Sequence, residues 1–260
     1  MSFRTAVTGG VTYLYSDILG CPHAFTTRYG GVSAKEHLAT LNLGENRGDD
    51  PENVKENFRR ICAAAGLPES VVGAKQIHST KVLYASAPPE EKPEADGFYT
   101  DKEGLTLCVK IADCMPILLY EPEARVIAAV HAGWRGSAAN IAAVGVEKLC
   151  ALGARRENVR AAAGPCIGSC CFEVKDDFVA EFTALLGKKT AGEHLIYRDG
   201  RIFADLKGLN RALLLRAGLR EEHLDISPLC TCCEPSRFFS HRATGGVRGT
   251  MGALIALPAK

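Results

Sequence analysis

The segment Val126-Ile-Ala-Ala-Val-His-Ala-Gly-Trp-Arg-Gly136 decides the fold class of this chain. Its first five residues form an uninterrupted apolar run, which is typical of a strand buried on both faces. A glycine-flanked turn follows, and apolar residues then recur at helical spacing from Ala138 to Leu152. The segment therefore predicts a central strand, a turn, and a helix that begins near Arg135.

Strand and helix patterns intermix on both sides of this segment without a regular strand–helix repeat. Further strands are predicted at residues 81–85, 105–111, 117–120, 159–163 and 253–257. A helix is predicted from Asp50-Pro51 to Gly66, because aspartate caps a helix and proline fits its first turn. Two later helical stripes span Phe178–Leu185 and Leu206–Leu213, the second with Asp205 as its cap, and the proline-rich residues 86–95 indicate a surface loop. We predict an α+β fold.

The composition favours one folded domain over residues 1–260. Hydrophobic residues make up 47% of the chain, and 31 Lys plus Arg oppose 30 Asp plus Glu, so the net charge of +1 argues against nucleic acid and polybasic membrane binding. No apolar run reaches the roughly 18 residues of a membrane span. The N-terminus lacks a basic segment followed by a long apolar one. We therefore expect a cytoplasmic protein whose eleven cysteines are reduced.

Three residues at or beside the ends of predicted strands have donor atoms that suit zinc: His78, Cys114 and His131. Three protein ligands leave one position for water or substrate, which is the catalytic arrangement. Taken alone, His78 is better explained as a surface or half-buried histidine, and Cys114 as a packing thiol. His131 follows five apolar residues, where a polar ring needs a buried partner, so a functional role is favoured. Asp113 is a candidate general acid, a residue that orients a ligand, or only a turn cap.

Several arginines near predicted turns are candidates for anion binding. Arg135 lies where the helix after the central strand begins, so it either holds an anion together with free backbone N–H groups or pairs with a surface carboxylate. Arg28, Arg242 and Arg248 lie beside glycine-rich loops, and each taken alone is better explained as a solvated charge. Trp134 either stacks on a nucleobase or covers the core.

Two groups of cysteines, within residues 166–171 and 230–233, invite comparison with a second metal site. They do not supply the two paired C-x-x-C spacings of a zinc ribbon, and adjacent cysteines chelate one ion poorly. We expect packing thiols. The residues concerned are Cys166, Cys170, Cys171, Cys230, Cys232 and Cys233.

Six segments carry a resemblance to one family. The most specific are Ala112-Asp-Cys-Met-Pro116 and Ala129-Val-His-Ala-Gly-Trp-Arg-Gly136. The others are Gln76-Ile-His78, Ala95-Asp-Gly97, Gly164-Pro-Cys-Ile-Gly168 and Phe238-Phe-Ser-His-Arg242. Together they resemble the YfiH-like family, whose members are also described as laccase-domain or polyphenol oxidase proteins, peptidoglycan editing factors and purine nucleoside phosphorylases. The resemblance extends from about Phe25 to the C-terminus.

The resemblance implies a four-layer α/β/β/α sandwich with mixed sheets and a zinc ion, or copper, held by His78, Cys114 and His131. It also implies phosphorolysis of adenosine, inosine and methylthioadenosine to free base and ribose 1-phosphate, with adenosine deamination as a second activity. Cys114, His131 and Asp113 are the expected catalytic residues. A purine nucleoside and phosphate are the expected partners, and the residues expected to bind them are Arg28, Arg135, Arg242, Arg248 and Gln76.

Two segments depart from the family pattern. Many relatives have a histidine after Leu-Asn-Leu-Gly-x, where this chain has Asn46 followed by Arg47, so no role is carried over for that histidine. Some relatives have Arg-Arg-Asp where this chain has Arg242-Ala-Thr244, and this difference bears on anion binding.

Three other interpretations use the same residues. A copper polyphenol oxidase would need more histidines than the seven present, none of which forms a His-x-His pair. A metal-free hydrolase acting in peptidoglycan editing would use Cys114 as nucleophile and His131 as its base. A non-enzymatic binding protein would hold its metal for stability alone, so that His131→Ala would unfold it.

Overall fold

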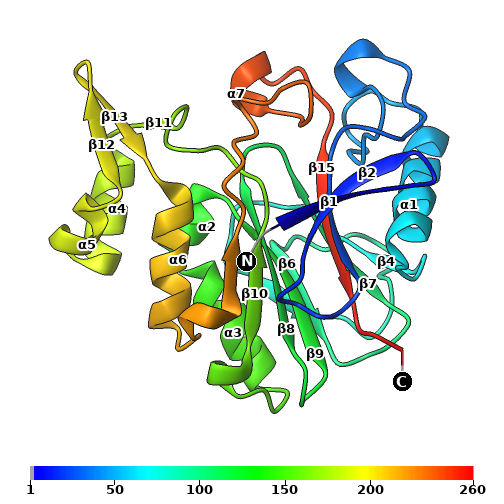
Figure 1. Ribbon diagram of the computed structural model, residues 1–260, viewed down its shortest axis with the longest axis horizontal. Coiled ribbons are helices and arrows are strands. Elements are labelled where there is room, and N and C mark those ends of the chain that lie inside the picture. The colour runs from blue at the N-terminus through cyan, green and yellow to red at the C-terminus, as the bar shows by residue number, and fades with distance from the viewer. Residues whose placement is uncertain (1–2, 260) are drawn as a thin grey trace.

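The computed structural model describes residues 3–259, and its core is two six-stranded mixed sheets packed face to face (Figure 1). The first sheet has the strand order β1 (Phe3–Thr8), β2 (Val11–Ser16), β3 (His23–Thr26), β15 (Met251–Ala256), β7 (Thr106–Ile111), β4 (Val71–Val72). The second has the order β14 (Leu224–Ile226), β10 (Arg160–Ala163), β8 (Met115–Glu121), β9 (Val126–Ala132), β6 (Gly97–Thr100), β5 (Val82–Tyr84). Only the β4–β7, β5–β6 and β10–β14 pairs of these two sheets are parallel within the described residues.

A small sheet and seven α-helices complete the part of the chain that is described. The small sheet has the order β11 (Glu173–Val174), β13 (Arg201–Ala204), β12 (Leu195–Arg198), and with two helices it projects at one end of the molecule (Figure 1). The helices are α1 (Pro51–Ala65), α2 (Trp134–Ala138), α3 (Ile141–Cys150), α4 (Asp176–Leu186), α5 (Lys188–Gly192), α6 (Leu206–Arg216) and α7 (His241–Thr244). Short 3-10 turns lie at Glu36–Leu38, Arg156–Asn158 and Glu221–His223.

Side chains alternate along the central strands, and this alternation produces four layers. On β15, Met251, Ala253 and Ile255 belong to the core between the two sheets, whereas Leu254 and Ala256 belong to the core beneath α1. On the far side, α3 and α6 cover the outer face of the second sheet (Figure 1). The order α1, first sheet, second sheet, α3 with α6 confirms the predicted α+β class and its α/β/β/α layering.

The predicted central strand is confirmed, since every residue of β9 is buried. Ala128 and Val130 pack on the helices, and Ile127 and Ala129 pack on the first sheet. The helix after it differs from the prediction, because it is divided into α2 and α3. Asn140 separates them with a left-handed φ of 63°, a conformation that asparagine tolerates better than most residues.

The first predicted helix is also confirmed. Asp50 accepts a hydrogen bond from the backbone N–H of Glu52, Pro51 is the first helical residue, and Gly66 ends α1 with a φ of 64°. The predicted strands correspond to β5, β7, β8, β10 and β15 with small shifts at their ends. Asp205 lies at the N-cap position of α6 as predicted, although its side chain makes no capping hydrogen bond.

Several strands have no counterpart in the sequence prediction. They are the β1–β2 hairpin with β3, the small sheet of β11, β12 and β13, and the short strands β4, β6 and β14. Most of β1 is exposed, and the side chain of Tyr197 on β12 is 70% exposed, so neither strand shows the apolar alternation of a half-buried strand. None of the helices within residues 3–259 combines the length and apolar character needed to cross a bilayer.

Candidate active site

His78, Cys114 and His131 converge at one end of the second sheet, where their donor atoms all lie within 4.8 Å of one another. His131 is near the end of β9, and Cys114 immediately precedes the neighbouring strand β8. The antiparallel register pairs Met115 with Ala132, so the sheet itself holds these two side chains together. His78 comes from the loop before β5; its Nε2 is 3.9 Å from the Sγ of Cys114, and its ring lies edge to face with that of His131.

Asp96 orients His131 and shapes the loop that carries His78. Its fully buried Oδ1 lies 2.9 Å from Nδ1 of His131 and accepts the backbone N–H of His78 at 3.0 Å, while its Oδ2 accepts the N–H and hydroxyl of Ser79. Burial alone would raise the pKa of Asp96, but these hydrogen bonds outweigh burial and hold its pKa below the usual range. Because the ionised carboxylate only accepts, Nδ1 of His131 carries a proton and Nε2 is left for a ligand.

The charges of Cys114 and His131 support each other. Burial opposes the charged form of both groups, but the imidazoles lower the pKa of the Cys114 thiol to about 6, and the thiolate together with Asp96 raises the pKa of His131 to about 9. The thiolate is the form of cysteine that binds metals and attacks electrophiles. Cys114 is therefore chemically suited to be a ligand or a nucleophile.

Gly133 leaves room between the three side chains. A Cβ at this position would lie 2.9 Å from Cδ2 of His78, 3.3 Å from Sγ of Cys114 and 3.4 Å from Cε1 of His131. Its φ of −62° and ψ of 160° are ordinary for any residue, so the local space rather than the backbone conformation requires glycine. Two imidazole nitrogens and one thiolate around such a space fit a zinc ion, and also copper, with an open coordination position.

Two adjoining cavities, of about 420 and 370 Å³, open onto these side chains, and together they form what we call the cleft. Both cavities are lined by His78, Cys114, Arg47 and Arg248. Volumes of this size, with apolar walls and a few polar groups, are typical of small-molecule sites. The apolar wall of the larger cavity comprises Trp134, Ile167, Phe172 and Leu206.

Arg248 is a cation with unused capacity for an anion. Its Nη1 donates to the carbonyl of Gly249 at 3.1 Å and to the hydroxyl of Thr250 at 3.0 Å, but its buried Nε finds no acceptor within residues 3–259. Burial and the nearby charge of Arg47 lower the pKa of Arg248 to about 10. Arg248 and Arg47 both line the cleft, so an anion bound there would offset their positive charges.

Arg242 and Asp113 also line the cleft, but both are already engaged. The guanidinium of Arg242 donates to the carbonyls of Cys171 at 2.8 Å and Glu173 at 3.2 Å. The carboxylate of Asp113 accepts the hydroxyl of Thr231 at 2.6 Å and the backbone N–H of Arg242 at 2.7 Å. These bonds join α7 and the Thr231 loop to the turn that carries Cys114.

Arg28 and Gln76 make hydrogen bonds to the main chain instead of facing the cleft as free groups. Arg28 donates to three backbone carbonyls and lies over the ring of Phe239, and it lines neither cavity. Gln76 lines the smaller cavity, but its amide group donates to the carbonyl and accepts from the N–H of Lys110, both at 2.7 Å. Both side chains therefore serve to hold neighbouring main-chain segments together.

Arg135 is exposed on α2, with its guanidinium carbon 4.3 Å from the centre of the Trp134 ring, and it lines neither cavity. Trp134 also packs on Phe178 of the core, with ring centres 5.7 Å apart, and lines the cleft. It covers the core and also faces the cleft.

Asp96 and Arg47 are site residues that the sequence alone did not identify. Asp96 stands between Ala95 and a predominantly apolar strand. A single acidic residue in such a stretch is the sequence feature that could have identified it, since a buried carboxylate needs partners. Arg47 was noted in the sequence only because it follows Asn46, which replaces a histidine of the family pattern, and it was not identified as a site residue. Its place beside Arg248 depends on a contact between distant segments.

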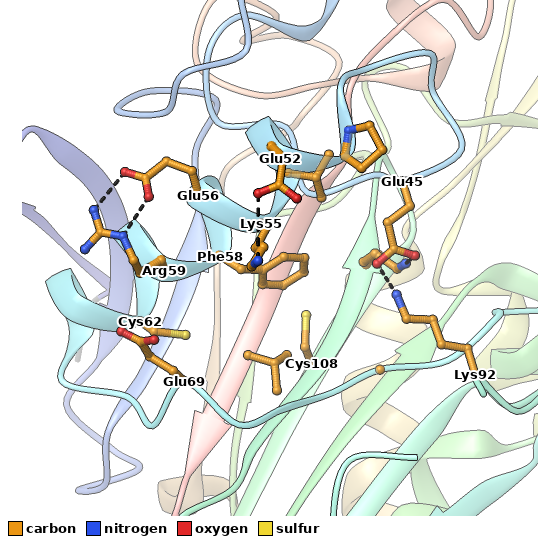
Figure 2. Close-up of a pocket in the computed structure, with 15 residues that line it drawn as sticks. Glu45, Glu52, Lys55, Glu56, Phe58, Arg59, Cys62, Glu69, Lys92 and Cys108 are labelled. Atoms are coloured by element: carbon orange, nitrogen blue, oxygen red, sulfur yellow. Dashed lines mark hydrogen bonds and ion pairs between the residues drawn. The ribbon is translucent and has the colours of Figure 1, made fainter. Parts of the chain in front are cut away.

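Another cavity, of about 660 Å³, lies between α1 and the first sheet, and none of the three candidate ligands lines it (Figure 2). Most of its charged side chains pair with one another, as Glu56 does with Arg59 at 2.6 Å. Burial raises the pKa of Cys62 and of Cys108 to about 12, so both thiols are unreactive. Size alone therefore does not mark this cavity as a site of chemistry.

The two groups of cysteines, predicted as packing thiols, converge in the structure. The sulfur atoms of Cys170, Cys171, Cys230 and Cys233 all lie within 4.8 Å of one another. Cys230 and Cys233 stand at C-x-x-C spacing, which is the sequence signal for this arrangement. We call these four residues the cysteine cluster.

Comparison with known proteins finds relatives that match most of this chain. A protein from Deinococcus radiodurans named purine nucleoside phosphorylase is 42% identical over 250 residues, covering 96% of this chain and 94% of that protein. A protein from an unknown prokaryotic organism named adenosine deaminase is 33% identical over 238 residues, covering 85% and 88%.

The fold and the family model lead to the same group of proteins. The crystal structure of the Bacillus licheniformis hypothetical protein YfiH matches with a TM-score of 0.89 and 30% identity, covering 98% of each chain. Residues 22–258 match the family model described as multi-copper polyphenol oxidoreductase laccase. With its motifs, its four layers and these matches in agreement, the chain belongs to the YfiH-like family.

Proposed function

We propose that this protein is a zinc-dependent purine nucleoside phosphorylase that uses phosphate to cleave adenosine, inosine or methylthioadenosine into the free base and the ribose 1-phosphate. The observation that carries the proposal is the convergence of His78, Cys114 and His131 on a cleft that is also lined by Arg47 and Arg248. The name of the Deinococcus radiodurans relative supports this reaction class.

Arg248 and Arg47 would hold the phosphate. In phosphorolysis a phosphate oxygen forms a bond to the anomeric carbon while the bond from that carbon to the purine nitrogen breaks. The phosphate must therefore be held beside the sugar, and two guanidinium groups, close enough to repel each other's charge, provide both attraction and position. Arg248 lines both cavities, so it lies at the junction where the two substrates would meet.

The apolar wall of the cleft would receive the purine. Phe172 and Leu206 contribute apolar surface, and Trp134 is held by Arg135 on its ring and by Phe178 in the core. A fixed aromatic wall orients a flat base at little cost in side-chain entropy. The larger cavity, about 420 Å³, lies within the usual size range of small-molecule sites.

The residues proposed as metal ligands are positioned by Asp96 and by the sheet. Asp96 keeps the proton of His131 on Nδ1, so Nε2 faces the other two donors. When bound, zinc supplies a Lewis acid for a substrate oxygen or nitrogen, or an activated water that would serve the deamination of adenosine. Both oxygens of Asp113 accept hydrogen bonds, so we assign it a positioning role instead of that of a general acid.

The test is product analysis with adenosine in the presence and absence of phosphate. Adenine and ribose 1-phosphate that form only with phosphate are the expected products, identified by mass. Inosine alone, formed without phosphate, would instead support a deaminase, and unchanged adenosine and inosine would contradict the proposal. Metal analysis of protein made without added copper separates zinc from the copper oxidation that the description of the family model names.

A second candidate, a metal-free thiol hydrolase, is favoured by one observation. Cys114 has a pKa near 6 beside His131, which Asp96 orients in turn, and this is the order of nucleophile, base and carboxylate in cysteine hydrolases. An acyl adduct on Cys114 after incubation with an ester or amide substrate would support it. Loss of that hydrolysis after chelation would contradict it.

A further inference from the structure

The cysteine cluster forms where two loops meet beside the cleft. Cys170 and Cys171 follow β10, whereas Cys230 and Cys233 follow β14, the strand paired with β10. The Sγ of Cys233 lies 3.2 Å from that of Cys170 and 3.4 Å from that of Cys171. A backbone bridge between Cys166 and Cys230 continues the pairing of the two strands into the loops.

A tight turn brings the adjacent cysteines to the same partner. The backbone N–H groups of Cys171 and Phe172 both donate to the carbonyl of Gly168, at 3.0 and 2.9 Å. The N–H of Gly168 donates in turn to the Sγ of Cys230 at 3.1 Å, and this contact favours a negatively charged sulfur. Within this turn, the adjacent Cys170 and Cys171 both reach Cys233.

We propose that Cys170, Cys171, Cys230 and Cys233 form a four-thiolate site for a structural zinc ion, separate from the candidate active site. Zinc–sulfur bonds of about 2.3 Å in a tetrahedron place sulfur atoms about 3.8 Å apart. The separations here, 3.2 Å for one pair and no more than 4.8 Å for any, bracket that spacing. Four sulfur ligands fill the coordination shell of zinc, so this site leaves no position for substrate.

The site would fix one rim of the cleft. Phe172, which follows Cys171, lines the cleft, and the carbonyl of Cys171 accepts a hydrogen bond from Arg242. Thr231, which follows Cys230, donates its hydroxyl to Asp113. An ion that ties the two loops together would therefore hold an aromatic wall, a cation and the turn before Cys114 in place. Its loss should raise the KM for nucleoside more than it lowers kcat.

The experiment is zinc counting by mass spectrometry on protein purified without added metal. We expect roughly two zinc ions per chain in the wild type, about one in Cys114→Ser and about one in the double variant Cys230→Ser/Cys233→Ser. Cys150→Ser, which alters a partly buried cysteine of α3 outside both groups of donors, is the matched control and should keep both ions.

Cobalt substitution supplies a measurement that does not depend on folding of the double variant. Cys114→Ser protein loaded with Co²⁺ should show the intense absorption of a tetrahedral cobalt–thiolate site, since the cysteine cluster is intact. Absence of that absorption, or a disulfide that joins Cys233 to Cys170 or Cys171 in protein purified without oxygen, would overturn the proposal. An unchanged zinc count in the folded double variant would overturn it as well, and none of these outcomes bears on whether phosphorolysis occurs.

Discussion

The two groups of donor atoms in this protein differ in composition, support and access. The group of His78, Cys114 and His131 mixes two imidazoles with one thiolate, is held by neighbouring strands, and faces the cleft. The cysteine cluster has four sulfurs on two loops and spans the rim. A set of three ligands beside a cavity suits chemistry, and a set of four without an open position suits structure.

Access and polarity also distinguish the cleft from the cavity beneath α1. The cavity beneath α1 contains charged side chains that mostly pair with one another and thiols whose pKa is raised, whereas the cleft is lined by a thiol whose pKa is lowered and by Arg248, whose Nε has no acceptor within residues 3–259. Perturbed groups that converge indicate a functional site better than volume does. The following variants test these differences.

The largest effect is expected from Cys114→Ser. Serine has nearly the same shape but no thiolate, so the zinc of the candidate active site should be lost. The value of kcat/KM should then fall more than 100-fold, which exceeds the usual effect of removing a hydrogen-bond partner of a metal ligand. Zinc counting and phosphorolysis rates measure this. Cys150→Ser should retain both properties, and an active Cys114→Ser enzyme would show that this thiol does not hold the metal.

Asp96→Asn should have the next largest effect and should lower both the zinc affinity and kcat/KM by a factor on the order of 10 to 100. Asparagine keeps the shape but removes the charge that orients His131, and its NH2 group faces N–H donors. Competition with a zinc chelator measures the affinity. Asp101→Asn, an exposed change five residues along the chain, is the control; equal effects in the two variants would remove the special role of Asp96.

Arg248→Gln should raise the KM for phosphate about tenfold while both zinc ions remain bound. The loss corresponds to roughly 1.5 kcal/mol, the low end for a hydrogen bond to a charged group, because Arg47 remains nearby. Phosphate dependence of the initial rate is the measurement, with exposed Arg135→Gln as its control. If the KM for phosphate stays constant in Arg248→Gln, the anion binds elsewhere.

Gly133→Ala should weaken zinc binding roughly fivefold. The effect should stay below the roughly 100-fold loss of rate that a 1 Å misplacement of a catalytic group can cause, because the exposed side chain of His78 can move by a few tenths of an ångström. The backbone conformation suits alanine, so the thermal midpoint of unfolding should change little. Gly73→Ala, where a Cβ meets nothing within 4 Å, is the control. Equal zinc affinity in both variants would mean that the ion does not lie beside Gly133.

Elements with strong local patterns could be predicted from the sequence. The apolar run of β9 and the capped, amphipathic α1 each carry their own signal, and both were predicted correctly. The β1–β2 hairpin was not predicted, because most of β1 is exposed and shows no apolar alternation, although its pairing is local and runs across the Gly9-Gly10 turn. The division between α2 and α3 depends on one left-handed asparagine that apolar spacing does not reveal.

The candidate site was predictable in its donors but not in its partners. His78, Cys114 and His131 were chosen by residue type and position at strand ends, and the structure brings them together. Asp96 could not be placed, since its bond to His131 depends on the packing of β6 beside β9. The arginines had similar local sequences, and only the fold shows that Arg28 is occupied by backbone carbonyls, whereas the Nε of Arg248 has no acceptor in the described part of the chain.

The most direct test of the account is the release of ribose 1-phosphate from inosine as zinc is added back to chelator-treated protein. Ribose 1-phosphate should be absent from the stripped protein, should increase with added zinc, and should require phosphate at every point. Cys114→Ser protein should stay inactive at the same zinc concentrations. Phosphorolysis at the full rate without zinc, or none at saturating zinc in correctly folded wild-type protein, would contradict the account.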